Sequence, residues 1–157
     1  MNELKNRATE KAEAFTQVVT ADERWNLQDE LMCQVFGFTA YGYIFGTGRV
    51  HHFLDEEDIH KIVLSQLTHI GLGAKYATGL VEAAGNEFKT EDNNSIHNKL
   101  IGIGHSHALQ ENMEVLVNSV FENTVEIRQM SNSPTEKNAT ESPGTTPKQD
   151  KPWWKFW

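Results

Sequence analysis

The sequence contains a single cysteine, Cys33, and lacks a long hydrophobic run. One cysteine excludes an internal disulfide, and its apolar neighbours indicate a buried, unreactive thiol. The most apolar stretch, residues 35–45, is interrupted by glycines and is much shorter than the roughly 20 residues that span a bilayer. Residues 1–5 contain no apolar run of the kind found in secretory signals. We therefore expect a cytoplasmic protein with no membrane span.

The sequence also lacks a clustered basic stripe, with which nucleic-acid-binding proteins neutralise phosphates. The 157 residues carry a formal net charge of -8. The charge is uneven, because residues 1–130 hold 19 acidic and 10 basic residues, whereas residues 131–157 hold 3 and 4. We expect no nucleic-acid partner, and a partner attracted to the acidic body should be basic.

Motifs of nucleophilic and nucleotide-binding enzymes are absent as well. The sequence has no Gly-x-Ser-x-Gly elbow and no Gly-x-x-x-x-Gly-Lys-Ser/Thr loop. We therefore assign no catalytic residue and expect no cofactor.

The spacing of apolar residues predicts an all-α fold, a single compact bundle of five or six helices within residues 1–130. Apolar residues recur at intervals of three and four, and no segment alternates at a period of two for more than a few residues. The expected helices lie near residues 2–19, 21–46, 55–70 and 74–88; a fifth begins with Ile96, Leu100 and Ile103, and apolar residues between 113 and 125 mark a sixth. A capping-box pattern at residues 20–23 predicts the start of the second helix, which carries Trp25 and ends near Gly46. Gly37 and Gly42 inside that helix indicate close approach of another helix.

All seven histidines lie between residues 51 and 107. This density suggests a metal site, because neutral imidazole is the commonest transition-metal ligand. However, the His-Glu-x-x-His pattern of helical zinc sites is absent. A composite site would take its ligands from two segments: His51 or His52 with Asp55 or Glu56, and His105 with His107 from a turn led by Gly104. The histidines therefore have two interpretations. They lie in surface or hydrogen-bonded, half-buried positions, or they form a metal site, in which case the chain is a metal-binding protein or a metal-dependent enzyme.

Four consecutive acidic residues, Asp55, Glu56, Glu57 and Asp58, precede an apolar helical stripe. Negative charge is favourable at the positive end of a helix dipole, so the run is typical of a solvated helix start. It would also serve as an electrostatic patch for a basic partner, which the acidic body favours. We keep both interpretations and treat the four residues as candidate partner-binding residues.

Residues 131–152 contain no large apolar side chain. We expect them to form a disordered linker, because they cannot bury enough surface to offset their ordering entropy. An aromatic tip follows at residues 153–157 and consists of Trp153, Trp154, Phe156 and Trp157 around Lys155. We predict that this tip recognises a protein partner, because aromatic side chains dominate binding hot spots. Docking on the protein's own body and peripheral contact with lipid headgroups are the alternatives.

Two stretches carry a resemblance to a known family. They are Phe-Gly-Phe-Thr-Ala-Tyr-Gly-Tyr at residues 36–43 and Asn-Ser-Ile-His-Asn-Lys-Leu-Ile-Gly at residues 94–102. Over about residues 25–109 the chain resembles small helical bacterial immunity proteins, which neutralise the toxins of toxin/immunity systems. The resemblance implies a cytoplasmic, non-catalytic protein that binds a cognate toxin. We therefore expect a non-enzymatic protein-binding module, an immunity protein with a tethered aromatic tip.

Overall fold

The computed structural model describes residues 2–90 and 95–132. They form six α-helices and one π-helical segment: α1 (Asn2–Ala21), α2 (Glu30–Gly46), η1 (Thr47–His51), α3 (Glu56–His69), α4 (Ala74–Lys89), α5 (Ile96–Ser106) and α6 (Glu114–Asn132). No strand occurs in this part of the chain, which confirms the predicted all-α bundle.

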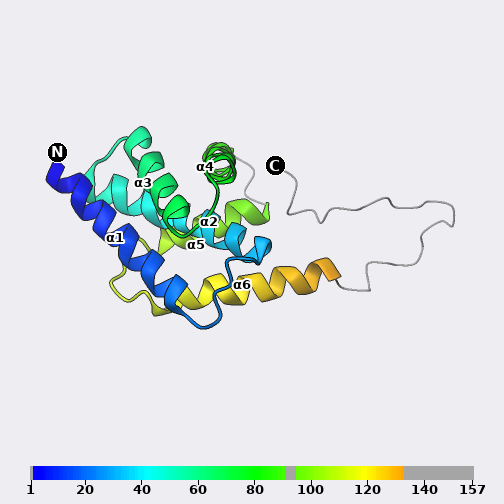
Figure 1. The fold of residues 1–157 in the computed structure, drawn as a ribbon. Helices are drawn as coiled ribbons and strands as arrows, with labels where there is room; N and C mark the ends of the chain where they lie inside the picture. Colours follow the sequence, from blue (N-terminus) through cyan, green and yellow to red (C-terminus); the bar gives the residue numbers. More distant parts are fainter. Residues whose placement is uncertain (1, 91–94, 133–157) are drawn as a thin grey trace.

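Helix α2 is the centre of the bundle, and the other five α-helices contact it (Figure 1). Of its 17 residues, 15 are buried. A helix on the surface of a bundle needs only one apolar stripe, whereas a helix that is apolar all round is buried by its neighbours. The nearly continuous apolar sequence of residues 31–46 therefore explains why this helix occupies the middle of the fold.

Helices α2 and α5 pack with backbone against backbone. A Cβ atom added to Gly42 would lie 1.9 Å from the carbonyl oxygen of Ile101, and one added to Gly104 would lie 1.9 Å from that of Thr39. Only glycine fits at these two positions. The predicted close approach at Gly42 is confirmed. It is also confirmed at Gly37, where an added Cβ would lie 2.6 Å from a side chain of α4.

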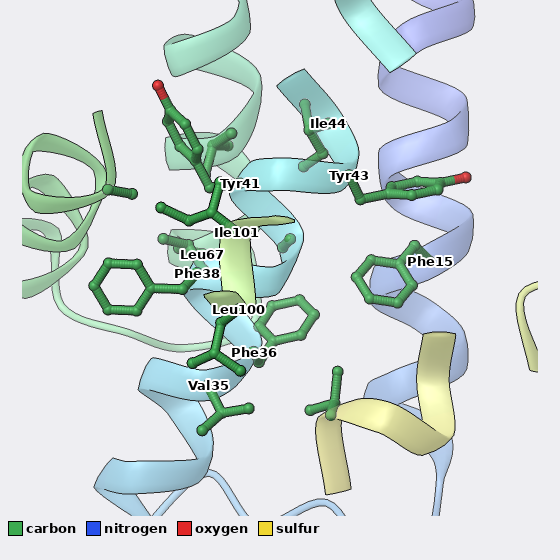
Figure 2. Packing of buried hydrophobic residues seen from close by; sticks show 14 of the residues in the cluster. Phe15, Val35, Phe36, Phe38, Tyr41, Tyr43, Ile44, Leu67, Leu100 and Ile101 are labelled. Atoms are coloured by element: carbon green, nitrogen blue, oxygen red, sulfur yellow. The ribbon is translucent and has the colours of Figure 1, made fainter. Parts of the chain in front are cut away.

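Aromatic rings fill the space on both sides of α2. Phe15 of α1 packs against Phe36 and Tyr43, with ring centroids 5.7 and 5.1 Å apart. Phe38 and Tyr41 point to the opposite side of the helix (Figure 2). All of these rings are at most 2% exposed, so α2 is anchored from both directions.

The predicted start of the second helix is wrong. Thr20 belongs to α1, where its hydroxyl donates to the carbonyl oxygen of Thr16 at 2.9 Å. A threonine side chain can either cap the next helix or bond back to its own helix, and a capping-box pattern does not distinguish the two. Helix α2 begins after Asp29, whose carboxylate accepts a hydrogen bond from the Met32 amide at 3.2 Å. Trp25 consequently lies in the connection between α1 and α2.

The other predicted boundaries agree more closely with the structure. Helix α2 ends at Gly46, and Ser95 caps α5 by accepting a hydrogen bond from the Asn98 amide at 3.0 Å. Helix α6 includes Ser131 and Asn132, two residues of the segment predicted to be the linker. The rest of that linker lies outside the described residues. No helix in the described part of the chain has both the length and the apolar composition needed to cross a bilayer.

Candidate functional site

The turn between η1 and α3 holds a bulky aromatic residue in an unusual backbone conformation. Phe53 has a φ angle of 54°, and among the described residues it is the only one other than glycine with a positive φ. The Leu54 amide closes this turn by donating to the carbonyl oxygen of Gly48 at 2.9 Å. Glycine usually occupies the left-handed position after a helix end, because a Cβ there costs roughly 1–2 kcal/mol.

Phe53 is exposed although its two sequence neighbours are buried. Its exposed fraction is 77%, compared with 7% for His52 and 3% for Leu54. Val50, in η1, is 50% exposed. The buried neighbours therefore anchor the turn and hold an aromatic ring and a valine at the surface.

The acidic run after this turn starts α3. Asp55 is the N-cap residue, and its carboxylate accepts a hydrogen bond from the Asp58 amide at 2.9 Å. The other three carboxylates lie in the first helical turn, where the helix dipole favours negative charge. The prediction of an acidic helix start is therefore confirmed.

Lysines from three helices lie next to the acidic run. The ion pairs are Glu56–Lys89 at 3.0 Å, Glu57–Lys61 at 3.1 Å and Asp58–Lys5 at 3.2 Å. These side chains are partly or largely exposed, so each pair is weak and screened by solvent. Asp55 and Glu57 are the two exposed carboxylates of the run. We call Val50, Phe53, Asp55 and Glu57 the Phe53 face.

Behind this face, a polar cluster connects α3 to the core. The Tyr41 hydroxyl lies 2.7 Å from Nε2 of His60, and the same nitrogen lies 3.7 Å from a carboxylate oxygen of Glu56. Burial, and to a smaller extent the charge of Glu56, raises the pKa of Tyr41 far above its usual range. The hydroxyl is therefore protonated at neutral pH and can donate to the imidazole.

The ionisation of His60 and Glu56 is set by the same surroundings. Burial lowers the pKa of His60, and Lys89 adds to this effect, whereas Glu56 opposes it. The hydrogen bond from Lys89 lowers the pKa of Glu56. At neutral pH the cluster thus contains a neutral tyrosine, a neutral histidine and an ion pair, an arrangement suited to fixing α3 in place.

The histidines of the composite metal site have different surroundings. His52 is buried, His105 is exposed on α5, and Nδ1 of His107 lies 2.9 Å from the Ile103 carbonyl oxygen. The His51 side chain lies outside what the structure describes. The predicted turn led by Gly104 is wrong, because this glycine lies within α5 and packs against α2. No three histidine, cysteine, aspartate or glutamate side chains of the described residues are grouped closely enough to hold a metal ion.

Cys33 is buried, as its apolar neighbours predict. Its thiol lies 3.3 Å from the Leu27 carbonyl oxygen, to which it donates. Burial, together with the charges of Asp29 and Glu30, raises the pKa of this thiol to about 11. A protonated, buried thiol is a poor nucleophile.

The sequence identifies only part of this site. Asp55 and Glu57 were predicted as binding residues, whereas Val50 and Phe53 were not. The available signal was an aromatic residue two positions before an acidic helix start, in a turn that contains no glycine after Gly48. The predicted tip residues Trp153, Trp154, Phe156 and Trp157 lie outside the described residues.

No family model, no curated protein and no solved structure matches this chain.

Proposed function

We propose that this protein is a non-enzymatic binding module that uses the Phe53 face to bind a basic protein partner. The observation that carries the proposal is Phe53, an aromatic residue that is 77% exposed and has a left-handed backbone. Strained backbone conformations cluster at functional sites, and aromatic residues are frequent binding hot spots. Burial of this ring by a partner would contribute about 1.5–3 kcal/mol, which the free protein does not gain.

The charge around Phe53 supports a basic partner. Asp55 and Glu57 are exposed and follow Phe53 within four residues. Residues 1–130 as a whole contain 19 acidic and 10 basic residues. An acidic surface of this kind accelerates encounter with a basic protein and disfavours acidic ones.

We further propose that the partner is a toxin and that this chain is its immunity protein. Support comes from the resemblance of residues 25–109 to small helical immunity proteins. The acidic body would complement the basic active site of a toxin that acts on nucleic acid. The aromatic tip would supply a second contact, and its tether to the body would raise its effective concentration at the partner.

The test is cross-linking capture from the native cells with three baits: the wild-type chain, Phe53→Gly and Val125→Ser. Val125 is the control position, because it is apolar and 55% exposed on α6. Arg128 of the same helix pairs with Asp29, just before α2 begins, whereas Phe53 follows the end of α2. We expect one basic partner that the wild type and Val125→Ser capture equally and that Phe53→Gly loses. Expression of this partner should arrest growth, and co-expression of the wild-type chain should restore it.

The outcomes separate the parts of the proposal. Equal capture by Phe53→Gly and the wild type would show that the Phe53 face is not the binding site. A captured partner that leaves growth unchanged would contradict the immunity function. A chain that stops at residue 150 should keep its melting temperature and lose affinity, and a lower melting temperature would indicate that the tip docks on its own body.

A further inference from the structure

A groove of about 530 Å³ lies on the outer side of the α3–α4 pair. Its apolar floor includes Leu64, which is half-buried against the core, and Val81, which is 5% exposed. His60 is among its lining residues. Because the hydrogen bond to Tyr41 holds His60, this part of the groove wall is fixed by the core.

The groove is acidic on both sides. Glu56, which pairs with Lys89, and Glu57 line it from α3, and Glu82 lines it from α4. The one basic residue in its lining, Lys61, pairs with Glu57 at 3.1 Å. Glu82 is exposed and forms no ion pair with the part of the chain that the structure describes. An apolar floor between carboxylates is complementary to a segment that carries both apolar and basic side chains.

The groove is continuous with the Phe53 face, because Glu57 belongs to both. Its lining residues occur at positions 56, 57, 60, 61 and 64 of α3 and at 78, 81 and 82 of α4, so it runs beside the first half of α3 and about one turn of α4. Apolar grooves between helices are typical binding sites for an amphipathic helix, whose anchors recur every three or four residues. Phosphate-rich ligands such as nucleic acids and anionic lipids are disfavoured by the same carboxylates.

We infer that the α3–α4 groove binds a basic amphipathic helix of the protein partner, with apolar side chains on Leu64 and Val81 and a lysine or arginine at Glu82. This inference rests on the proposed function and names the partner chemistry at an extension of the Phe53 face. The partner's helix lies along α3, and its neighbouring surface covers Phe53.

The experiment measures the fluorescence anisotropy of a labelled amphipathic peptide, built of leucine and lysine at helical spacing, with the full chain. We expect binding that weakens with salt, and no binding of the same peptide with glutamate in place of lysine. Glu82→Lys should weaken the affinity about tenfold or more. The matched charge reversal Glu126→Lys, on exposed α6 surface, should change it by less than about twofold. Leu64→Ala should weaken binding without changing its salt dependence.

Three results would overturn the inference. Equal losses in Glu82→Lys and Glu126→Lys would mean that the peptide senses only the overall charge. Binding that appears only in a chain stopped at residue 150 would mean that residues 151–157, which combine aromatic and lysine side chains, occupy the groove instead. Failure of the peptide to bind either chain would remove the groove as a helix site.

The proposed function is tested separately. Phe53→Gly should leave the peptide affinity within about twofold of the wild type, because Phe53 does not line the groove. If the full chain does not bind the peptide but capture of the partner still depends on Phe53, the groove inference alone is refuted. Capture independent of Phe53 would refute the proposed function.

Discussion

The hydroxyl of Tyr41 and Nε2 of His60 are 2.7 Å apart, and this contact joins the central helix α2 to the first two turns of α3. Gly85 of α4 leaves the space for it, since an added Cβ would lie 3.2 Å from Cε1 of His60. Three helices therefore meet at one imidazole. The carboxylates of the Phe53 face begin the same helix, so this partly buried hydrogen bond positions an exposed surface.

Tyr41→Phe should lower the free energy of unfolding by about 1–2 kcal/mol, because it leaves the His60 nitrogen without its donor. Chemical denaturation of Tyr41→Phe, His60→Ala and the double variant would measure the coupling. We expect a coupling energy of about 1 kcal/mol. Strictly additive effects would contradict a stabilising contact between the two side chains.

Stability should fall as the pH decreases through the range in which free histidine titrates. Burial lowers the pKa of His60 and also that of His97. The His97 ring stacks on Phe38, with the ring centroids 4.4 Å apart. Between the folded pKa and the unfolded value near 6.5, the unfolded chain binds more protons than the folded chain. The contribution that these two histidines make to the free energy of unfolding is therefore fully present above about pH 6.5. It is lost as the pH falls from there through their pKa values in the folded protein.

Melting temperatures at about pH 7.5 and pH 5.5, at constant ionic strength, would test this dependence. His60→Asn should reduce the difference between the two values. His69→Asn, at the exposed end of α3, should preserve it. A wild-type melting temperature that is the same at both pH values would contradict the prediction.

Gly42→Ala should destabilise the protein by about 3 kcal/mol or more, because the new methyl group would collide with the Ile101 carbonyl oxygen. Gly102→Ala is the matched control, since it is also helical and has no atom within 4 Å of an added Cβ. It should stabilise the protein by about 0.5–1 kcal/mol. Similar melting temperatures for the two variants would show that α2 and α5 are not in backbone contact.

Phe53→Gly should raise the free energy of unfolding by about 0.5–1 kcal/mol while abolishing partner binding. Glycine removes the strain of the left-handed backbone, and part of this gain is offset by the greater freedom of the unfolded chain. The Phe53 ring is mostly exposed, so little packing is lost. Leu54→Ala, at a buried neighbour, should instead cost about 2–5 kcal/mol. A destabilised Phe53→Gly would show that the ring packs on the body.

Asp55→Ala should lower stability by about 0.5–2 kcal/mol, because it removes the cap of α3. Glu57→Ala should change stability by less than about 0.5 kcal/mol, since its ion pair with Lys61 is exposed. Thermal denaturation of both variants would measure the difference. Equal effects would mean that the acidic run acts only through its total charge.

The helical class and the close helix approach at Gly42 could be predicted because both depend on local patterns. Apolar residues at intervals of three and four report a helix wherever it lies. Gly42 was predicted as a close contact for the same reason, since a glycine inside a helix requires an explanation.

The start of α2 could not be predicted because Thr20 has two ways of bonding its hydroxyl. Its pattern with Glu23 fits a capping box, yet the hydroxyl bonds back to Thr16 and prolongs α1. Likewise, Gly104 directly before His105 suggested a turn, although it lies within α5, where the absence of a Cβ lets it pack on the Thr39 backbone. At Thr20 both alternatives are local hydrogen bonds, whereas the role of Gly104 is visible only when α5 packs on α2.

The sequence by itself determined the helical class, the close contact at Gly42 and the acidic start of α3, because each follows from the residues within a few helical turns. Only the tertiary structure decided that Lys5 and Lys89 lie beside this acidic run, and that Tyr41 holds His60. It also decided that Phe53 is exposed in a left-handed turn, because burial of His52 and Leu54 on either side fixes the backbone between them. Contacts between residues distant in the sequence, and the strain that they impose, arise only when the helices are packed together.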